Sequence, residues 1–175
     1  MTGARMEIKK IDTDTEKSAI AADILGGLPE WFGIPESVAE YVKNSAGMPF
    51  WAVYVEGRPV GFMALKETGT YTAEIYVCGI RKEYHRKGMG RALLGCFLDY
   101  AAGHGYEYVQ VKTVQKGHYP EYDRTNAFYE AVGFRELECF PDLWDVGNPC
   151  QVYVKYIGGQ CASERGRNLC REVNW

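Results

Sequence analysis

The sequence predicts a single α+β domain in which helices pack on the faces of a mixed β-sheet. Three observations support this fold class. The 175-residue chain is long enough for one full hydrophobic core and shows no internal repeat. Two β-rich runs around the turn EGRP give a hairpin signal. The order of elements from this hairpin onward is typical of a mixed sheet: the hairpin is followed by a strand, a loop, a helix, a strand, a helix and two strands.

The first third of the chain contains a short strand, two helices and the hairpin. A cap-type residue begins the first helix, which Gly26 and Gly27 end, and Pro35 lies just inside the second. These predicted elements are a strand at 6–11, helices at 14–27 and 35–47, and two strands within 50–67.

The rest of the chain begins with an apolar segment, Tyr71 to Ile80. It is too short for a typical helix, which indicates a central strand buried on both faces. A glycine-rich loop leads into a helix whose apolar residues, from Leu94 to Ala101, recur at helical spacing. The later predictions are a strand at 106–114, a loop at 115–123, a helix at 125–132, and strands at 134–140 and 150–157 joined by a long connection at 141–149. From 158 the pattern becomes polar, so we expect one domain at 1–157 and a polar C-terminal tail at 158–175.

The composition excludes several classes of protein. No apolar run approaches the roughly 20 residues that span a bilayer, and the N-terminus lacks the apolar stretch of a secretory signal, so we expect a cytoplasmic protein without membrane contact. The net charge of −3 argues against nucleic-acid binding, so any anion site must be local. The six cysteines show no CxxC pair or metal-ligand spacing. We therefore expect reduced thiols and no metal, with Cys161 and Cys170 the pair to watch.

Residues 84–94, YHRKGMGRALL, combine positive charge, bare backbone and a helix start. The first N–H groups of a helix lack partners inside it, and the helix dipole favours negative charge. Gly88 and Gly90 let the chain curl and a bulky anion approach. With the nearby cations, this suits a pyrophosphate, although the pattern is neither a Walker P-loop nor the Rossmann fingerprint. A solvated helix entry is the alternative for this loop taken alone.

With the strand AEIYVCGI and the segment NAFYEAVGF, this loop resembles the GCN5-related N-acetyltransferase superfamily, whose members transfer an acetyl group from acetyl-CoA to an amine. The resemblance extends from Met6 to Ile157 and is most specific from Glu74 to Gly90. It implies a twisted, mostly antiparallel sheet of about seven strands and about four helices, splayed at the fourth strand. The family loop reads Q/R-x-x-G-x-G/A, and here His85 takes its first position.

The resemblance implies acetyl-CoA as cosubstrate and no metal. Backbone N–H groups of the loop would hold the pyrophosphate, and the splayed strand would pair with the pantetheine arm. Gly79 agrees, because glycine within a strand commonly marks a bulge or a close backbone approach; a plain packing glycine is the alternative. The implied cofactor-binding residues are Cys78, Gly79, Ile80, His85, Arg86, Lys87, Gly88, Met89, Gly90, Arg91 and Asn126.

Acetyl transfer to an amine poses two proton problems. The amine must be neutral to attack, and CoA must leave as a thiolate. Tyr129 matches the family tyrosine that lies near the CoA sulfur and acts as general acid; the alternative is a packing aromatic. Asn126, one helical turn earlier, would contact the pantetheine or stabilise the helix start.

Glu74 is the candidate base. Its separation from His85 equals that of the catalytic glutamate from the glycine motif in the histone-acetylating branch of the superfamily. A carboxylate in an otherwise apolar strand is costly unless it is partnered, solvated or protonated, and such sites tend to be functional. The alternatives are an ion pair with Lys66 or Lys112, and a water chain in place of a dedicated base.

The resemblance places the acceptor between the link of the first two helices and the connection of the last two strands. Both segments combine aromatic and acidic residues that could receive a cationic amine, or whose aromatics simply pack the loops. The candidate acceptor-binding residues are Glu30, Trp31, Phe32, Asp142, Trp144 and Asp145. The acidic balance shows no long docking surface, which favours a small-molecule amine.

The sequence thus favours an N-acetyltransferase that uses direct transfer from acetyl-CoA to a primary amine in a ternary complex. The alternatives are a protein or peptide N-acetyltransferase, a non-catalytic acyl-CoA sensor or interaction module, and a nucleotide phosphate-binding protein. The last explains the glycine loop but not NAFYEAVGF. Homodimerisation is an expectation that comes from the resemblance alone.

Overall fold

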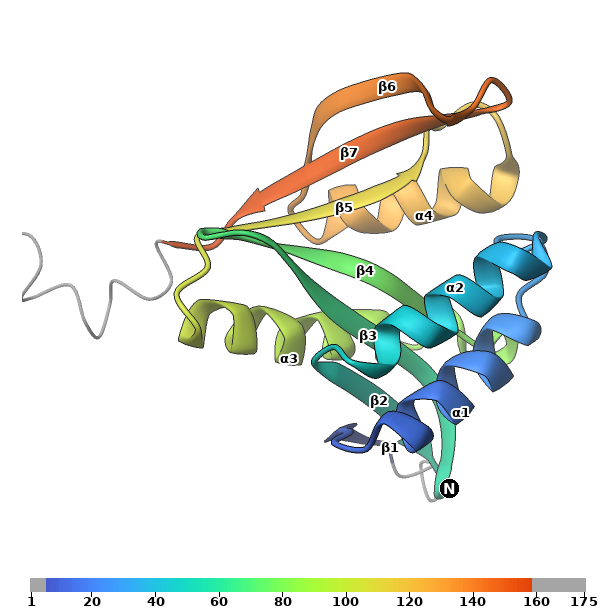
Figure 1. The fold of residues 1–175 in the computed structure, drawn as a ribbon, viewed down its shortest axis with the longest axis vertical. Helices are drawn as coiled ribbons and strands as arrows, with labels where there is room; N and C mark the ends of the chain where they lie inside the picture. Colours follow the sequence, from blue (N-terminus) through green and yellow to red (C-terminus); the bar gives the residue numbers. More distant parts are fainter. Residues whose placement is uncertain (1–5, 159–175) are drawn as a thin grey trace, which may run out of the picture.

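The structure is a computed structural model that describes residues 6–158, which form one seven-stranded sheet flanked by four α-helices (Figure 1). The strands are β1 (Met6–Lys10), β2 (Phe50–Val55), β3 (Arg58–Gly69), β4 (Thr72–Ile80), β5 (Tyr108–Val114), β6 (Arg135–Asp145) and β7 (Asn148–Tyr156). The helices are α1 (Asp14–Gly26), α2 (Pro35–Ala46), α3 (Met89–Gly103) and α4 (Pro120–Ala131), with a short 3₁₀ helix η1 (Lys82–Tyr84). The predicted α+β class is confirmed. The expected tail at 158–175 lies, from 159 onward, outside the described residues.

The sheet has the strand order β1-β2-β3-β4-β5-β7-β6, and it splits in its middle. Every neighbouring pair is antiparallel except β4 and β5, which run parallel. Their pairing extends only from Thr72 opposite Tyr108 to Ile75 opposite Val111. Beyond that point the two strands diverge, as Figure 1 shows. The predicted splay at the fourth strand is therefore confirmed, and it leaves an unpaired edge on each strand.

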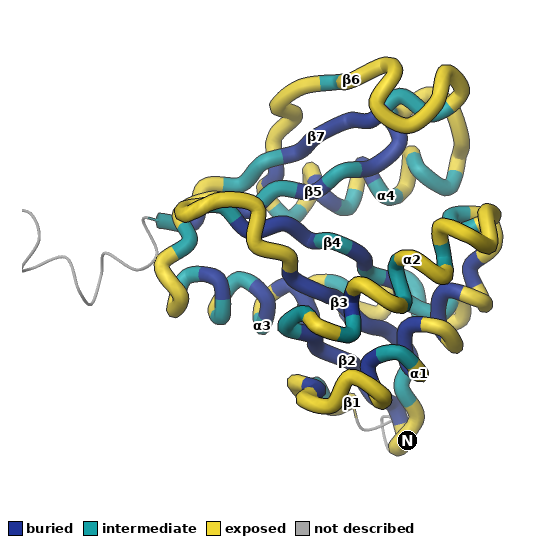
Figure 2. Tube along the Cα trace, in the orientation of Figure 1, coloured by how far each residue is buried: buried dark blue, intermediate teal, exposed yellow. Residues whose placement is uncertain are grey.

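Two hydrophobic cores lie on opposite faces of the sheet. Alternation along β2 directs Trp51 and Val53 toward α3 and α4, whereas Phe50 and Ala52 face α1 and α2. The buried backbone in Figure 2 accordingly runs through the central strands, while β1 and β6 at the two edges are mostly exposed. The split in the sheet therefore has one hydrophobic core on each of its two faces.

A bulge on β4 marks the start of the split. Ile75 pairs with Leu65 and Val77 with Ala64, so Tyr76 is an extra residue between two ladder positions. A bulge of this kind re-aims the side chains that follow it. Tyr76 and Val77 consequently both pack on the α1 and α2 side, and Cys78 returns to the α3 side.

Two predicted boundaries near the C-terminus are wrong. The helix expected at 125–132 begins at Pro120, because proline at the first helical position needs no N–H partner. The long connection expected at 141–149 is mostly strand, since β6 continues to Asp145 and a tight turn leads to Asn148. β6 is an exposed edge strand that tolerates Pro141, so it shows no apolar alternation in the sequence.

Candidate active site

The N-terminus of α3 offers a group of free backbone donors beside the split. In the described part of the chain, no backbone or side-chain acceptor takes the N–H groups of residues 86–91, and the first helical bond runs from Ala92 N to Gly88 O at 3.0 Å. Gly88 has φ +82°, a left-handed conformation that glycine adopts without strain. These donors converge with the positive end of the helix dipole. The geometry is that of an anion site.

The side chains of this loop add positive charge. Within residues 6–158, Arg86, Lys87 and Arg91 enter no ion pair, and the Lys87 ammonium lies 5.3 Å from the centre of the Tyr84 ring. Arg86 itself has φ +60°, an uncommon conformation for a residue with a side chain. A protein of net charge −3 thus keeps a local, unneutralised cationic cluster at the amide donors.

Two glycines allow close approaches around the split. A Cβ on Gly90 would lie 3.3 Å from Ile80 Cδ1 and 3.3 Å from Phe128 Cζ, so the helix start is pressed against the end of β4 and against α4. A Cβ on Gly79 would lie 3.0 Å from Leu28 Cδ1. Gly79 therefore marks the close approach of α1, while the bulge lies three residues earlier.

His85 fastens the loop to the strand that precedes it. Its Nε2 lies 2.6 Å from the Ile80 carbonyl oxygen, which requires that this nitrogen carries the proton. The ring also meets Trp31 edge to face, with 5.7 Å between the ring centres. The first position of the glycine motif therefore contacts the protein itself.

Tyr129 and Cys78 meet on the α3 and α4 side of the split. The Tyr129 hydroxyl lies 3.6 Å from Cys78 Sγ, and Tyr129 is 3% exposed. Burial raises the pKa of Tyr129 well above 10, with the Cys78 thiol adding to the effect. Burial also raises the pKa of Cys78. The pair therefore holds a protonated phenol and a protonated thiol beside the unpaired edge of β4.

Glu74 approaches the split from the opposite face. It is 5% exposed, and its carboxylate accepts hydrogen bonds from Lys112 Nζ at 2.7 Å and from Gln110 Nε2 at 2.9 Å. The ion pair with a neighbouring-strand lysine that the sequence left open is thus formed, and Lys112 is the partner. Lys66 instead lies 5.4 Å from the centre of the Tyr76 ring.

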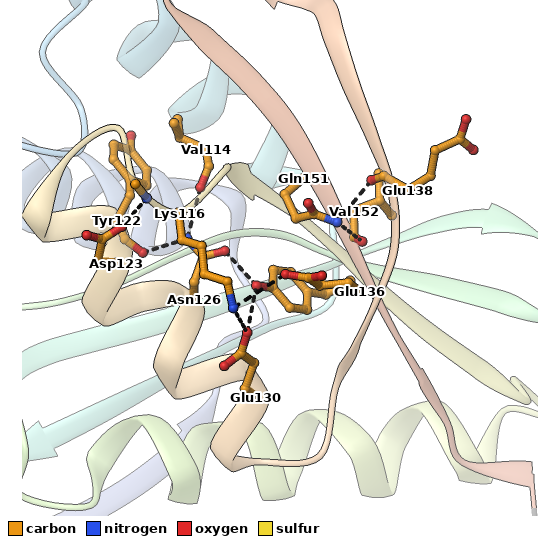
Figure 3. A network of polar contacts seen from close by, with 12 residues as sticks. Val114, Lys116, Tyr122, Asp123, Asn126, Glu130, Glu136, Glu138, Gln151 and Val152 are labelled. Carbon is orange, nitrogen blue, oxygen red and sulfur yellow. Dashed lines mark hydrogen bonds and ion pairs between the residues drawn. The ribbon is translucent and has the colours of Figure 1, made fainter.

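Asn126 is fully buried, and its side-chain polar atoms form hydrogen bonds with other residues of the protein (Figure 3). Its Nδ2 donates to Val114 O at 2.9 Å and to Tyr122 O at 2.7 Å, and its Oδ1 accepts from the Tyr153 hydroxyl at 2.8 Å. These bonds fix α4 to the end of β5 and to β7. Asn126 lies in the middle of α4 and not at its start, so it anchors the helix to the sheet, and its contact with the pantetheine arm stays a prediction.

The link between α1 and α2 reaches both sides of the split. Glu30 pairs with Lys82, and this hydrogen bond lowers the pKa of Glu30. Trp31 contacts α4, since its Nε1 donates to Thr125 Oγ1 at 3.1 Å. Phe32 begins a series of edge-on rings that continues through Tyr41 to Tyr76 on β4, with ring centres 5.9 and 5.5 Å apart. This link therefore borders the Glu74 face of the split.

The other three predicted acceptor residues lie on a second segment. Asp142, Trp144 and Asp145 belong to β6 and its turn, and in the described part of the chain no hydrogen bond, ion pair or ring contact joins them to the α1 and α2 link. Asp145 caps its own turn, accepting from Gly147 N at 2.8 Å and from Asn148 Nδ2 at 2.9 Å. No contact of these kinds joins the two segments within the described residues, and their placement on either side of an acceptor stays a prediction.

Several contact residues escaped the sequence analysis. Tyr41, Tyr76, Tyr122 and Thr125 touch the link or line the Glu74 face, and none carries a local motif. A surface cleft of about 430 Å³ between α1 and α2 is lined by apolar residues such as Phe32. It has none of the polar groups that acetyl transfer needs.

The described residues show neither a metal centre nor a membrane span. No three His, Cys, Asp or Glu side chains between residues 6 and 158 gather as ligands for a metal ion. Among the helices of that region, none has the length and apolarity needed to cross a membrane. The four described cysteines are free, whereas Cys161 and Cys170 lie outside the described residues.

Comparisons with known proteins agree with this arrangement. A sequence model of the acetyltransferase (GNAT) family matches residues 21–134. The chain is 29% identical over 105 residues to the uncharacterized N-acetyltransferase YsnE of Bacillus subtilis (strain 168), covering 60% of this chain and 66% of that protein. It is 32% identical over 77 residues to the N-alpha-acetyltransferase RimI of Mycobacterium tuberculosis (strain ATCC 25618 / H37Rv), covering 44% of each. The matched region thus spans less than two thirds of either curated relative.

Solved structures share the fold. The crystal structure of an aminoglycoside 6'-N-acetyltransferase complexed with coenzyme A superposes with a TM-score of 0.70 at 17% identity, covering 86% of this chain and 97% of that one. At this identity the likeness concerns the fold alone. A fold of this kind can serve different acceptors, so the site must decide the function.

Proposed function

The chain belongs to the acetyltransferase (GNAT) family, and from that premise we propose that it transfers the acetyl group of acetyl-CoA to a primary amine. The observation that carries the proposal is the free amide N–H group of residues 86–91 next to the unpaired edge of β4. A pyrophosphate suits the first feature and an extended amide chain suits the second. Tyr129 and Glu74 then lie on opposite faces of the same split.

The residues present fit acetyl-CoA. When bound, acetyl-CoA supplies an acetyl group activated as a thioester. The amides and cations from Arg86 to Arg91 would hold its pyrophosphate, and β4 beyond Tyr76 would pair with its pantetheine arm. The closeness of Gly90 to Ile80 and Phe128 supports this fit, because a larger residue there would crowd the cradle.

Tyr129 would act as the proton donor to the departing sulfur. Its raised pKa keeps the phenol protonated at neutral pH, so the hydrogen is available when negative charge develops. A phenol of pKa near 10 or above cannot fully protonate a thiolate of pKa about 8.5 in water, so the main contribution is a hydrogen bond that strengthens in the transition state.

Glu74 would accept the proton of the amine. An alkylamine of pKa about 10.4 must lose a proton to attack, which at pH 7 costs about 4 to 5 kcal/mol. Lys112 and Gln110 orient the carboxylate, and they leave it on the side that the α1 and α2 link borders. The proton would move from the amine to Glu74 directly or through water.

Direct transfer in a ternary complex agrees with the state of Cys78. A covalent route would need a thiolate near the thioester, and burial raises the pKa of Cys78. Under direct transfer, intact mass spectrometry after incubation with acetyl-CoA should detect no acetylated protein. A stable adduct on Cys78 would contradict this part of the proposal.

A small-molecule amine is our first candidate acceptor, because the net acidic balance of the sequence gives no sign of a long docking surface. A polypeptide N-terminus is the second, since one relative is named an N-alpha-acetyltransferase. The test is thiol release from acetyl-CoA with polyamines, amino sugars, free amino acids and short peptides offered in parallel. Release with small amines supports the first candidate, release with peptides alone supports the second, and release with none overturns the enzyme proposal in favour of a sensor.

Three expectations remain predictions about the whole protein. We propose a homodimer, to be tested by light scattering, and a cytoplasmic location, to be tested by fractionation. We also propose that residues 1–157 form one domain. Deletion of 158–175 should then leave folding and CoA binding intact.

A further inference from the structure

Trp31 connects three segments that are far apart in the sequence. Its indole Nε1 donates to Thr125 Oγ1 at 3.1 Å, and its carbonyl oxygen accepts from the Tyr122 hydroxyl at 2.7 Å. Its ring meets the His85 ring with an interplanar angle of 74°. The link between α1 and α2 is thus joined both to α4 and to the glycine loop.

These contacts cross the split. His85 follows β4, and its Nε2 is bonded to the Ile80 carbonyl at the end of that strand. Tyr122 and Thr125 belong to α4, which follows β5. Because β4 and β5 are unpaired beyond Ile75, their ladder does not set the distance between the two arms. Trp31 supplies a connection where the sheet has none.

We propose that Trp31 is a positioning residue for the acetyl-CoA site, which holds the glycine loop at a fixed distance from α4 through its contacts with His85 and Thr125. The inference rests on the proposed function. A loop fixed in advance loses less conformational freedom when its ligand binds, so binding is tighter. The left-handed Arg86, next to His85, also needs surroundings that hold it in place.

The arrangement also couples the two substrates. The same link that Trp31 fastens to the loop carries Phe32, whose ring contacts Tyr41 and through it Tyr76 on the Glu74 face. A ligand that shifts the loop therefore shifts the border of the acceptor side, and linkage makes that effect reciprocal. The Tyr122 hydroxyl donates the hydrogen bond to the Trp31 carbonyl oxygen. Burial raises the pKa of Tyr122 to about 12, so this hydroxyl keeps its proton and remains a donor.

The experiment uses coenzyme A as the probe and measures its dissociation constant by calorimetry and its dissociation rate by stopped flow. Trp31→Phe keeps a ring against His85 but removes the N–H donor, and Thr125→Val removes the acceptor. We expect each to weaken CoA binding about fivefold, mainly through faster dissociation, and the double variant to lose no more than either single one. Thr125→Ser keeps the hydroxyl and should retain wild-type affinity.

Trp51→Phe is the matched control, because it makes the same change at a buried tryptophan on β2 that packs on Phe97 and Tyr100. It should lower the melting temperature without changing CoA affinity. The proposal is overturned if Trp31→Phe behaves in the same way, or if the Trp31 and Thr125 effects add. If the wild-type protein binds no CoA, the proposed function itself fails, which is a different result.

Discussion

At the scale of single residues, the proposed chemistry depends on two groups that face the split from opposite sides. Within residues 6–158, the hydrogen-bond partner of the Tyr129 hydroxyl is the Cys78 thiol, and the Tyr129 ring belongs to the core beneath α3 and α4. Glu74 is bound by Lys112 and Gln110 on the other face. Chemistry that needs both a proton donor and a proton acceptor fits this placement, and simple packing does not require it.

Tyr129→Phe removes the hydroxyl and keeps the ring. We expect turnover to fall on the order of 10²-fold, while acetyl-CoA affinity changes little, because the lost hydrogen bond matters most in the transition state. Steady-state kinetics and calorimetry on the same preparation give both values. Equal turnover in the variant would reduce Tyr129 to a packing residue.

The raised pKa of Tyr129 predicts the shape of the pH profile. The donor is the protonated form, and that form persists above pH 10 because burial raises the pKa. Ionisation of Tyr129 should therefore cause no fall in turnover below pH 10. Any alkaline decline below that pH should appear equally in the wild type and in Tyr129→Phe. The measurement compares the kcat profiles of the two proteins up to the pH at which either begins to unfold.

Glu74→Gln separates a base from an ion-pair partner. As a base, Glu74 cannot be replaced by an amide, so turnover should fall on the order of 10²-fold in the single variant and stay low in Glu74→Gln with Lys112→Met. If Glu74 serves only to neutralise Lys112, the double variant should recover. Kinetics at saturating acetyl-CoA with the best amine of the panel decide between them.

At the scale of elements, the split and the start of α3 place backbone groups where a ligand can use them. β4 stays paired with β3 on both sides of the bulge at Tyr76 but loses β5 after Ile75. Alternate amides between Tyr76 and Ile80 therefore face the split without a strand partner. The amides of residues 86–91 lack acceptors for a different reason, because they begin a helix.

Hydrogen exchange should report both sets of amides. In the free protein the split-facing amides of 76–80 and the amides of 86–91 should exchange quickly, and addition of acetyl-CoA should protect both. The amides of β7 between β5 and β6 serve as an internal control, since they are already paired and should not change. Protection confined to another region would place the ligand elsewhere.

Local patterns in the sequence could predict the elements that bear the chemistry. The glycines, cations and apolar spacing of 84–94 indicated a loop and a helix start, and the structure has both. The start of α4 was missed because Pro120 resembles a loop residue as much as a first helical residue. The extent of β6 was missed because an exposed edge strand has no buried face to give it a period.

Contacts between distant segments could not be predicted in the same way. Trp31 and Thr125 are 94 residues apart, and nothing in either segment indicates the other. The choice of Lys112 over Lys66 as the partner of Glu74 likewise depends on side-chain packing: both lysines lie on strands beside β4, but the Lys66 ammonium lies over the Tyr76 ring.

At the scale of the whole molecule, two cores hold the sheet between pairs of helices. Several tyrosines are buried where desolvation favours the neutral phenol over the charged phenolate. Burial, with hydrogen bonding to Glu16, raises the pKa of Tyr54 to about 12, and burial raises that of Tyr122 to about 12. When the pKa of a tyrosine is higher in the folded than in the unfolded chain, its contribution to the free energy of unfolding is complete at any pH below the unfolded pKa.

The contribution of these tyrosines to the free energy of unfolding should consequently be constant up to pH 10 and fall between pH 10 and about 12. Urea denaturation at pH 9 and pH 11 measures the loss. Tyr54→Phe cannot ionise and should lose less stability over the same interval. A variant that loses as much as the wild type would show that Tyr54 is not a source of the dependence.

The central claim is that the loop before α3 binds acetyl-CoA, and calorimetric titration tests it most directly. Gly90→Glu places a carboxylate and extra bulk at the amide donors, whereas Gly95→Glu adds the same charge further along α3, where a Cβ meets nothing within 4 Å. We expect acetyl-CoA to bind the wild type and Gly95→Glu at roughly micromolar concentration, and to bind a folded Gly90→Glu at least about 100-fold more weakly. No binding to the wild type, or equal binding to both variants, would contradict it.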